Sequence, residues 1–288
     1  MAENKNIELI RGDPKVAILK LSIPTTIAML IVMVYNLTDS IWIAGIGANA
    51  IAATGFTSPL YMFVGGLGNA IGSGGNSLIA RAIGADDKKL ADNAGCHTIL
   101  LALALTIIFT ILTVGLLRPM LEIMQAGAAM DYAMTYGTIS FSFTVFLLFS
   151  SVLAAIFRSE GDVKRATIPL ALTAFLNMIF DPVFIYGLDM GIAGAALATV
   201  LAGVGGLACF LYWFFLKKDT FVRIERQFYK HDFKMYKEIL FVGIPASIEQ
   251  LIMSATAIIL NAMLSAVAGT AAVAVYTAGW RLVQIGIM

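Results

Sequence analysis

Residues 93–117 read NAGCHTILLALALTIIFTILTVGLL, a stretch of 25 residues without Asp, Glu, Lys or Arg. A helix needs about 20 consecutive apolar residues to cross the hydrocarbon core of a bilayer. This stretch therefore predicts a transmembrane helix. Further apolar runs, none of which alternates with the period of two typical of barrel strands, lie at 16–45, 50–82, 130–157, 166–186, 190–216, 238–266 and 270–288.

The composition agrees with a chain that has lipid as its main solvent. Apolar residues make up 59% of the chain and charged residues 13%, whereas a soluble domain carries about 25% charged residues. We expect an all-α, polytopic membrane helix bundle in the lipid bilayer. The net charge of +1 gives no indication of nucleic acid as a partner, and the two cysteines form no disulfide or metal pattern.

The distribution of Lys and Arg predicts the orientation. If the N-terminus is cytoplasmic, 17 of the 19 basic residues lie on the inner side, Arg118 lies in an outer loop and Arg281 lies within the last apolar run. Cytoplasmic loops of membrane proteins carry an excess of basic residues. We therefore expect a multi-pass protein of the cytoplasmic membrane with its N-terminus inside the cell.

A weak internal repeat predicts the domain organisation. Residues 21–28 read LSIPTTIA and residues 242–249 read VGIPASIE. An even number of helices separates the two copies, so they have the same orientation and form a parallel repeat. We expect a first six-helix lobe at 1–216, a basic cytoplasmic linker at 217–237 and the first two helices of an incomplete second lobe at 238–288. A coincidence between two proline-containing helices is the alternative.

Polar side chains within the apolar runs indicate a cation site. By the rise of a helix, Asp39 and Asp181 each lie about 9 Å below the outer surface, and Asn177 is one turn from Asp181 on the same face. Thr199 reaches the same layer. Because Pro182 has no N–H, the carbonyl group of Met178 also loses its helical partner. Such oxygens suit a hard cation, and two carboxylates at this depth can hold a proton or a sodium ion.

Several of these residues also allow structural interpretations. Asp39 could simply end a helix near the headgroups, Asn177 could join two helices, and Tyr136 could be an interfacial residue or lie near the site. Glu249 could line a cleft between the lobes or face a polar partner. Arg281, a second candidate for the cleft, could pair with Glu249 or with a group of the rest of the second lobe.

Six motifs resemble one known family along the whole first lobe and into the second. The chain is similar to the MATE (multidrug and toxic compound extrusion) transporters, in their DinF-like branch, apparently in truncated form. The motifs are Ile23-Pro24, Asn36-Leu-Thr-Asp39, Ala80-Arg81-Ala-Ile-Gly84, Phe157-Arg158-Ser-Glu-Gly161-Asp162, Asn177-Met-Ile-Phe-Asp181-Pro182 and Gly191-Ile-Ala-Gly194-Ala-Ala-Leu-Ala-Thr199.

The resemblance implies two six-helix lobes around a central cleft and transport by alternating access. It implies export of organic, often cationic, compounds in exchange for Na⁺ or H⁺, with no other cofactor. Pro24 corresponds to the bend of the first helix. The remaining C-terminal lobe is an expected partner. The cation-binding positions, with Tyr136 nearby, are Asp39, Asn177, Asp181 and Thr199.

Three other functions remain to be compared. A flippase for lipid-linked oligosaccharides would need several cationic side chains in its cavity, and the first lobe has none in mid-membrane. An intramembrane aspartyl protease would resemble a Gly-x-Gly-Asp pattern, whereas Met178, Ile179 and Phe180 precede Asp181. We therefore expect no enzyme. A non-transporting fragment is the third alternative.

Overall fold

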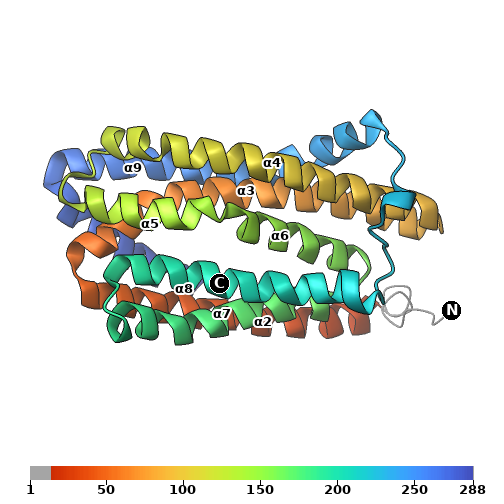
Figure 1. Cartoon of the computed structure of the whole chain (residues 1–288), viewed down its shortest axis with the longest axis horizontal. Coiled ribbons are helices and arrows are strands. Elements are labelled where there is room, and N and C mark those ends of the chain that lie inside the picture. The colour runs from red at the N-terminus through yellow and green to blue at the C-terminus, as the bar shows by residue number, and fades with distance from the viewer. Residues whose placement is uncertain (1–13, 288) are drawn as a thin grey trace.

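The computed structural model describes residues 14–287, and this part of the chain is all-α, with no strand, as predicted. The helices lie side by side along the long axis of the molecule (Figure 1). They are α2 (Pro14–Ile46), α3 (Ala48–Gly84), α4 (Lys88–Ile123), α5 (Met130–Ser142), α6 (Thr144–Ser159), α7 (Val163–Pro182), α8 (Gly191–Leu211) and α9 (Phe233–Ile287).

The helices match the predicted apolar runs. Within the described residues, 6 helices are long and apolar enough to span a membrane, and the pair α5 and α6, bent by 48°, has the length and composition of a seventh if it is taken as one span. Helix α9 is interrupted at Gly269, whose φ of 72° and ψ of −175° leave the helical region. Its two parts correspond to the last two predicted helices. The chain is therefore a multi-pass membrane protein.

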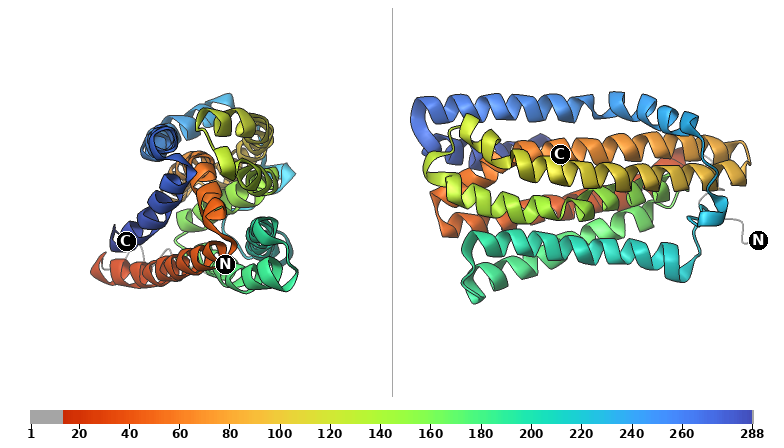
Figure 2. Two further views of the ribbon diagram at one scale, coloured as in Figure 1. Left: turned by 90° about the vertical axis from the view of Figure 1, so that its left-hand side faces the viewer. Right: turned by 45° about the horizontal axis from the view of Figure 1, so that its top comes forward.

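Helix α3 is the centre of the bundle and touches α9 most closely (Figure 2). A Cβ atom added at Gly74 would collide with the backbone carbonyl of Ile239, and one added at Gly243 would collide with that of Ala70. The two backbones thus approach each other without intervening side chains. Small residues allow such close contact between membrane helices, and this contact fixes α9 against the first six spans.

Helices α7 and α8 form a tight hairpin at the opposite end from the linker. After Pro182, whose missing N–H interrupts the α-helical ladder, a π-helical turn at Val183–Gly187 leads to the loop. A Cβ atom at Gly194 would lie 2.6 Å from the carbonyl oxygen of Phe184. The hairpin therefore brings the polar residues of α7 against the first turns of α8.

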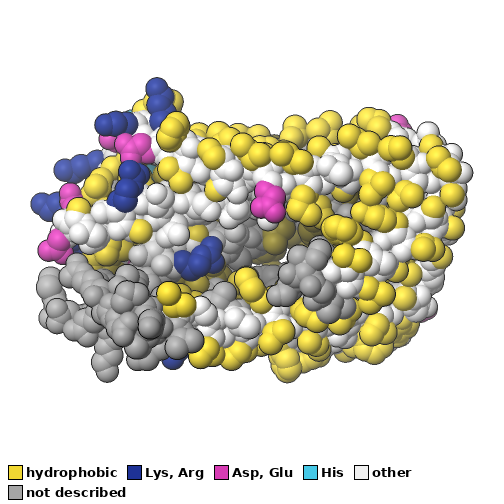
Figure 3. Space-filling model, turned by 180° about the vertical axis from the view of Figure 1, so that it is seen from behind, with side chains coloured by type: hydrophobic (Ala, Val, Ile, Leu, Met, Phe, Trp, Pro, Cys, Tyr) yellow, Lys and Arg dark blue, Asp and Glu magenta, His cyan; other side chains and the backbone are white. Residues whose placement is uncertain are grey.

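The linker between α8 and α9 is fastened to the first lobe. The Glu160 carboxylate accepts hydrogen bonds from the backbone N–H groups of Phe221 at 3.1 Å and Val222 at 2.8 Å. Asp92 accepts one from the N–H of Arg223 at 2.8 Å. The prediction placed this linker at 217–237, but α9 already begins at Phe233. Figure 3 shows that most of the visible Lys and Arg side chains gather at this end of the molecule, while hydrophobic side chains are spread over much of the opposite end.

The buried His97 side chain also helps to attach the linker to the first lobe. The Nε2 atom of His97 accepts a hydrogen bond from the backbone N–H of Asp232 at 3.1 Å, and its Nδ1 atom lies 2.9 Å from the carbonyl oxygen of Asn93. The side chain of Asn93 bonds both the N–H and the carbonyl group of Lys230. His97 is thus a packing residue that holds the linker.

Candidate functional site

Three of the predicted polar residues lie together between α7 and α8. Asn177 and Asp181 are 1% and 0% exposed. In the amide orientation that satisfies its neighbours, the Asn177 nitrogen donates to Asp181 Oδ2 at 2.7 Å, and the amide oxygen lies 3.2 Å from Thr199 Oγ1. Thr199 also donates from its hydroxyl group to the Ala195 carbonyl. The backbone N–H of Thr199 donates to the Asn177 amide oxygen at 3.2 Å, so the amide links the Asp181 carboxylate to Thr199.

The second carboxylate oxygen of Asp181 has no partner. Asp181 Oδ1 is buried and makes no hydrogen bond among the described residues. A buried acceptor without a partner is costly, and a buried charge more so. A proton or a hard cation at this oxygen would remove that cost, and oxygen ligands are those that such cations prefer.

The side chains that meet between α7 and α8 offer oxygen atoms as ligands. In the part of the chain that the structure describes, no group of 3 or more His, Cys, Asp and Glu residues could hold a metal ion. The polar layer instead offers carboxylate, amide and hydroxyl oxygens from Asp181, Asn177 and Thr199. The structure thus provides oxygen ligands of the predicted kind.

Asp39 lies on α2, which packs along α7. Its nearest ionic partner is Arg281, whose Nη1 atom is 3.6 Å from Asp39 Oδ2. The Arg281 guanidinium also donates to the hydroxyl groups of Ser40 and, at 3.1 Å, Thr54. Asp39 is therefore paired with a cation of this chain itself, at the point where α2, α3 and α9 meet.

This pairing corrects the interpretation of Arg281 from the sequence. Among the described residues its ionic partner is Asp39 and not Glu249. Glu249 is exposed, and none of the ion pairs between described residues includes it. Because Gly269 turns the second part of α9 back across the bundle, Arg281 points toward α2 rather than toward the first part of α9.

The remaining predicted residues lie around this layer. Tyr136 is buried with Ile43 and Ile185, and its ring centroid is 6.2 Å from that of Tyr61. Met178 is half-buried between Asn177 and Asp181 on α7. The α2 helix continues without interruption through Pro24, and the bend at this position stays a prediction.

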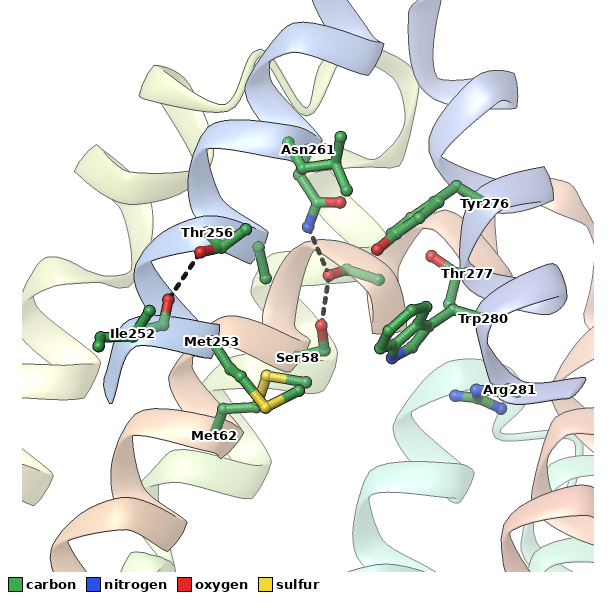
Figure 4. A pocket seen from close by; sticks show the side chains of 13 residues that line it. Ser58, Met62, Ile252, Met253, Thr256, Asn261, Tyr276, Thr277, Trp280 and Arg281 are labelled. Carbon is green, nitrogen blue, oxygen red and sulfur yellow. Dashed lines mark hydrogen bonds between the residues drawn. The ribbon is translucent and has the colours of Figure 1, made fainter. Parts of the chain in front are cut away.

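A cavity that sequence reasoning missed opens beside Arg281. Its volume is about 340 Å³, and α3 and both parts of α9 enclose it (Figure 4). The side chains of Tyr276, Thr277, Trp280 and Arg281 line it from the second part of α9. Their spacing of one and four residues places them on one helix face. This spacing is the sequence signal from which that wall of the cavity could have been predicted.

Comparison with known proteins gives concordant results. A family model described as MatE matches residues 24–183. The multidrug export protein MepA of Staphylococcus aureus is 29% identical over 270 residues, which are 93% of this chain and 59% of MepA. MepA of Staphylococcus saprophyticus is 28% identical over 265 residues, which are 91% of this chain and 58% of that protein.

Solved structures show the same fold. The outward-facing conformation of a multidrug resistance MATE family transporter superposes with a TM-score of 0.89 at 39% identity, covering 98% of this chain and 63% of that chain. A Pyrococcus furiosus transporter of the MOP superfamily, described as having a binding pocket of reverse polarity, gives the same values. The chain thus spans about three fifths of the length of its relatives. On the family match, which covers more than half of its residues, the chain belongs to the MatE family of transporters.

Proposed function

We propose that this chain is part of a cation-coupled antiporter that exports small organic compounds by alternating access, with Na⁺ or H⁺ as the coupling ion. The observation that carries the proposal is the polar layer of the first lobe. There the Asp181 carboxyl group, whose buried Oδ1 atom has no partner among the described residues, lies beside Asn177 and Thr199. Ionisable residues within membrane spans are rare and usually mark an ion or substrate pathway.

The ion would be held by the oxygens of Asp181, Asn177 and Thr199, with Asp39 on the neighbouring helix α2 as a second carboxylate of the site. Binding of a proton or Na⁺ would neutralise a buried charge, and its release would restore that charge. Two conformations of the protein, one that stabilises the charged site and one that stabilises the neutralised site, would therefore differ in their affinity for the ion. Such a difference is the requirement for coupling an ion to a conformational change.

Export by a whole transporter would also involve the part of the relatives' length that this chain does not span. We propose that a second lobe, which begins with α9, completes the central cleft. The basic end of the molecule would face the cytoplasm of a cell whose plasma membrane holds the protein. Because the curated relatives are multidrug export proteins, they do not favour the flippase alternative.

A melting scan of the purified chain against NaCl and KCl at one ionic strength tests the ion site. If Na⁺ binds only the folded state, a concentration about tenfold above its Kd adds about 1.4 kcal/mol of stability. We expect NaCl, or a lower pH, to raise the melting temperature of the wild type and not that of Asp181→Asn. The control is Asp131→Asn, which removes an exposed carboxylate of α5. Equal responses of wild type and Asp181→Asn to both NaCl and pH would defeat the proposal.

A further inference from the structure

The cavity between α3 and α9 has apolar walls. Met62 of α3 faces Met253 of α9, and the Tyr276 and Trp280 rings stack with their centroids 6.2 Å apart (Figure 4). Methionine and aromatic side chains provide adaptable apolar contacts. The volume of about 340 Å³ falls at the lower end of the range of about 300–1,000 Å³ found for small-molecule sites.

Four of the neutral polar groups of the cavity already make hydrogen bonds within the protein. Asn261 Nδ2 and Ser58 Oγ both donate to the carbonyl oxygen of Gly55, at 2.8 and 2.9 Å. The hydroxyl groups of Thr256 and Thr277 donate to carbonyl oxygens within α9. These four groups stabilise α9 and its contact with α3, and each already donates a hydrogen bond within the protein. The lining also contains the hydroxyl group of Tyr276 and the indole N–H of Trp280.

Arg281 differs from all of them. Among the described residues that line the cavity, it is the one with a formal charge, and no carboxylate lines the wall. An organic cation in this cavity would meet a guanidinium and no carboxylate in the lining, whereas an organic anion would meet a partner. The sign of the charge therefore selects the class of ligand.

The guanidinium is placed to change partners. It donates to Ser40 and Thr54 and has more N–H groups than these two bonds use. Its ion pair with Asp39 is long, at 3.6 Å, and the Arg281 side chain is 22% exposed. Arginine binds carboxylates in a two-point geometry that is stronger than a long single contact. A carboxylate in the cavity can thus compete with Asp39.

We propose that this cavity binds an amphipathic organic anion whose carboxylate pairs with Arg281 and whose apolar body lies against Trp280, Met62 and Met253. The ligand would draw the guanidinium from Asp39, so Asp39 and the ligand would share one countercharge. This inference rests on the proposed function in one respect: the cavity would belong to the transport route only if the protein is a transporter. Binding itself would not require transport.

Because Asp39 and the anion share Arg281 as their countercharge, binding of the anion is coupled to the proposed ion site. Neutralising Asp39 would free Arg281 and strengthen the binding of the anion, and by reciprocity the bound anion would favour a cation at Asp39. The two ligands thus support each other in this conformation. An antiporter that exchanges the anion for the cation would have to bind the two ligands in different conformations.

Calorimetric titration of the purified chain with two naphthalene probes tests this inference. One probe is 1-naphthoate, and the other is 1-naphthylmethyl-trimethylammonium, a cation with the same ring system. Empty micelles correct for partitioning. We expect the wild type to bind the anion more tightly than the cation, and Arg281→Gln to lose affinity for the anion by about tenfold or more, the usual value of a charge-assisted hydrogen bond.

Two further variants complete the test. Asp39→Asn should bind 1-naphthoate several-fold more tightly than the wild type, because Arg281 loses its competing partner. Arg118→Gln removes the same charge from an exposed residue that pairs with Glu122 on α4 and should bind as the wild type does. Unchanged anion affinity in Arg281→Gln, or weaker anion binding in Asp39→Asn, would overturn the inference. If Arg281→Gln does not fold, Asp39→Asn decides.

The two proposals can fail separately. The change of melting temperature with NaCl or pH, and its loss in Asp181→Asn, tests the proposed ion site and is measured without a naphthalene probe. A selective loss of 1-naphthoate binding in Arg281→Gln concerns the cavity and is measured at constant salt and pH.

Discussion

Asn177 connects the two polar groups beside it, Asp181 on its own helix and Thr199 on the next. Its spacing of four residues from Asp181 predicted that both would face one way. The distance of Thr199 from the outer loop predicted a similar depth. The structure brings the three side chains together because the α7–α8 hairpin is short and Gly194 allows close packing.

Removing the amide of Asn177 should destabilise the fold. In Asn177→Leu the buried Asp181 carboxyl group loses the donor at 2.7 Å, and an unsatisfied buried group costs about 1–3 kcal/mol. Thermal unfolding in detergent measures this loss. The control is Thr167→Val, because the Thr167 hydroxyl group bonds only carbonyls of its own helix. Equal melting temperatures of Asn177→Leu and the wild type would refute the role of the amide.

The partner of Arg281 could not be predicted from spacing. Residues 233–287 read as two apolar runs, and the direction of the second depends on the backbone at Gly269. A glycine permits the positive φ that turns the chain there, but it does not dictate the angle. For the same reason the cavity, which needs both parts of α9, was beyond sequence reasoning.

Among the elements, the contact between α3 and α9 depends on two glycines. Gly74→Ala and Gly243→Ala should each destabilise the protein by about 1–3 kcal/mol, the usual cost of overpacking, because each added Cβ would meet a carbonyl of the other helix. Gly65→Ala is a matched control on α3, since nothing lies within 4 Å of its added Cβ. That control should be neutral or stabilising.

The measurement is the midpoint of unfolding for the three variants. If Gly65→Ala proved as harmful as Gly74→Ala, the loss would reflect helix substitution in general and not the backbone contact.

The attachment of the linker should depend on pH through Glu160. Burial raises the pKa of Glu160 from 4.5 to about 7, although the hydrogen bonds from Val222 and Phe221 lower it. Between these two values the folded state binds more protons than the unfolded state, so its stability falls as the pH rises. The whole change is at most about 3 kcal/mol. Unfolding should therefore become easier from about pH 4.5 to 7.

Glu160→Gln should remove this contribution to the slope, because glutamine does not titrate. Glu122→Gln, which changes an exposed carboxylate, should retain the slope of the wild type. A Glu160→Gln variant with the wild-type dependence on pH would contradict the assignment. Unfolding by denaturant at several pH values provides the comparison.

Several features of the elements were not visible in the sequence. The run at 130–157 contains no proline, yet the helix breaks at Phe143, where the Thr144 hydroxyl group bonds the Phe141 carbonyl. The basic linker was expected to be merely polar. Its attachment uses backbone N–H groups of residues 221–223, and such bonds depend on the path of the chain rather than on its composition.

At the scale of the whole molecule, apolar run length predicted the helical architecture, whereas the orientation inferred from the charge distribution stays a prediction. Each helix crossing must satisfy its own backbone hydrogen bonds in lipid, so a span leaves a strong signal in the sequence. The arrangement of the spans leaves a much weaker one, because lipid-facing and buried apolar residues look alike. The family motifs supplied what periodicity could not.

The orientation can be tested with single cysteines. In a chain with Cys96→Ala and Cys209→Ala, a membrane-impermeant maleimide added to intact cells should label Leu188→Cys, which lies in the exposed loop after α7. Lys89→Cys at the basic end should be labelled only after the cells are opened. The reverse pattern would place the N-terminus outside.

The central claim is that Asp181 binds the coupling ion, and infrared difference spectroscopy of the purified chain tests it most directly. The carboxyl bands are recorded before and after NaCl is added at fixed pH, and again across a change of pH without sodium. We expect a carboxyl band of a buried group that responds to one of these ions and is missing in Asp181→Asn. A difference spectrum identical in wild type and Asp181→Asn for both ions would contradict the account.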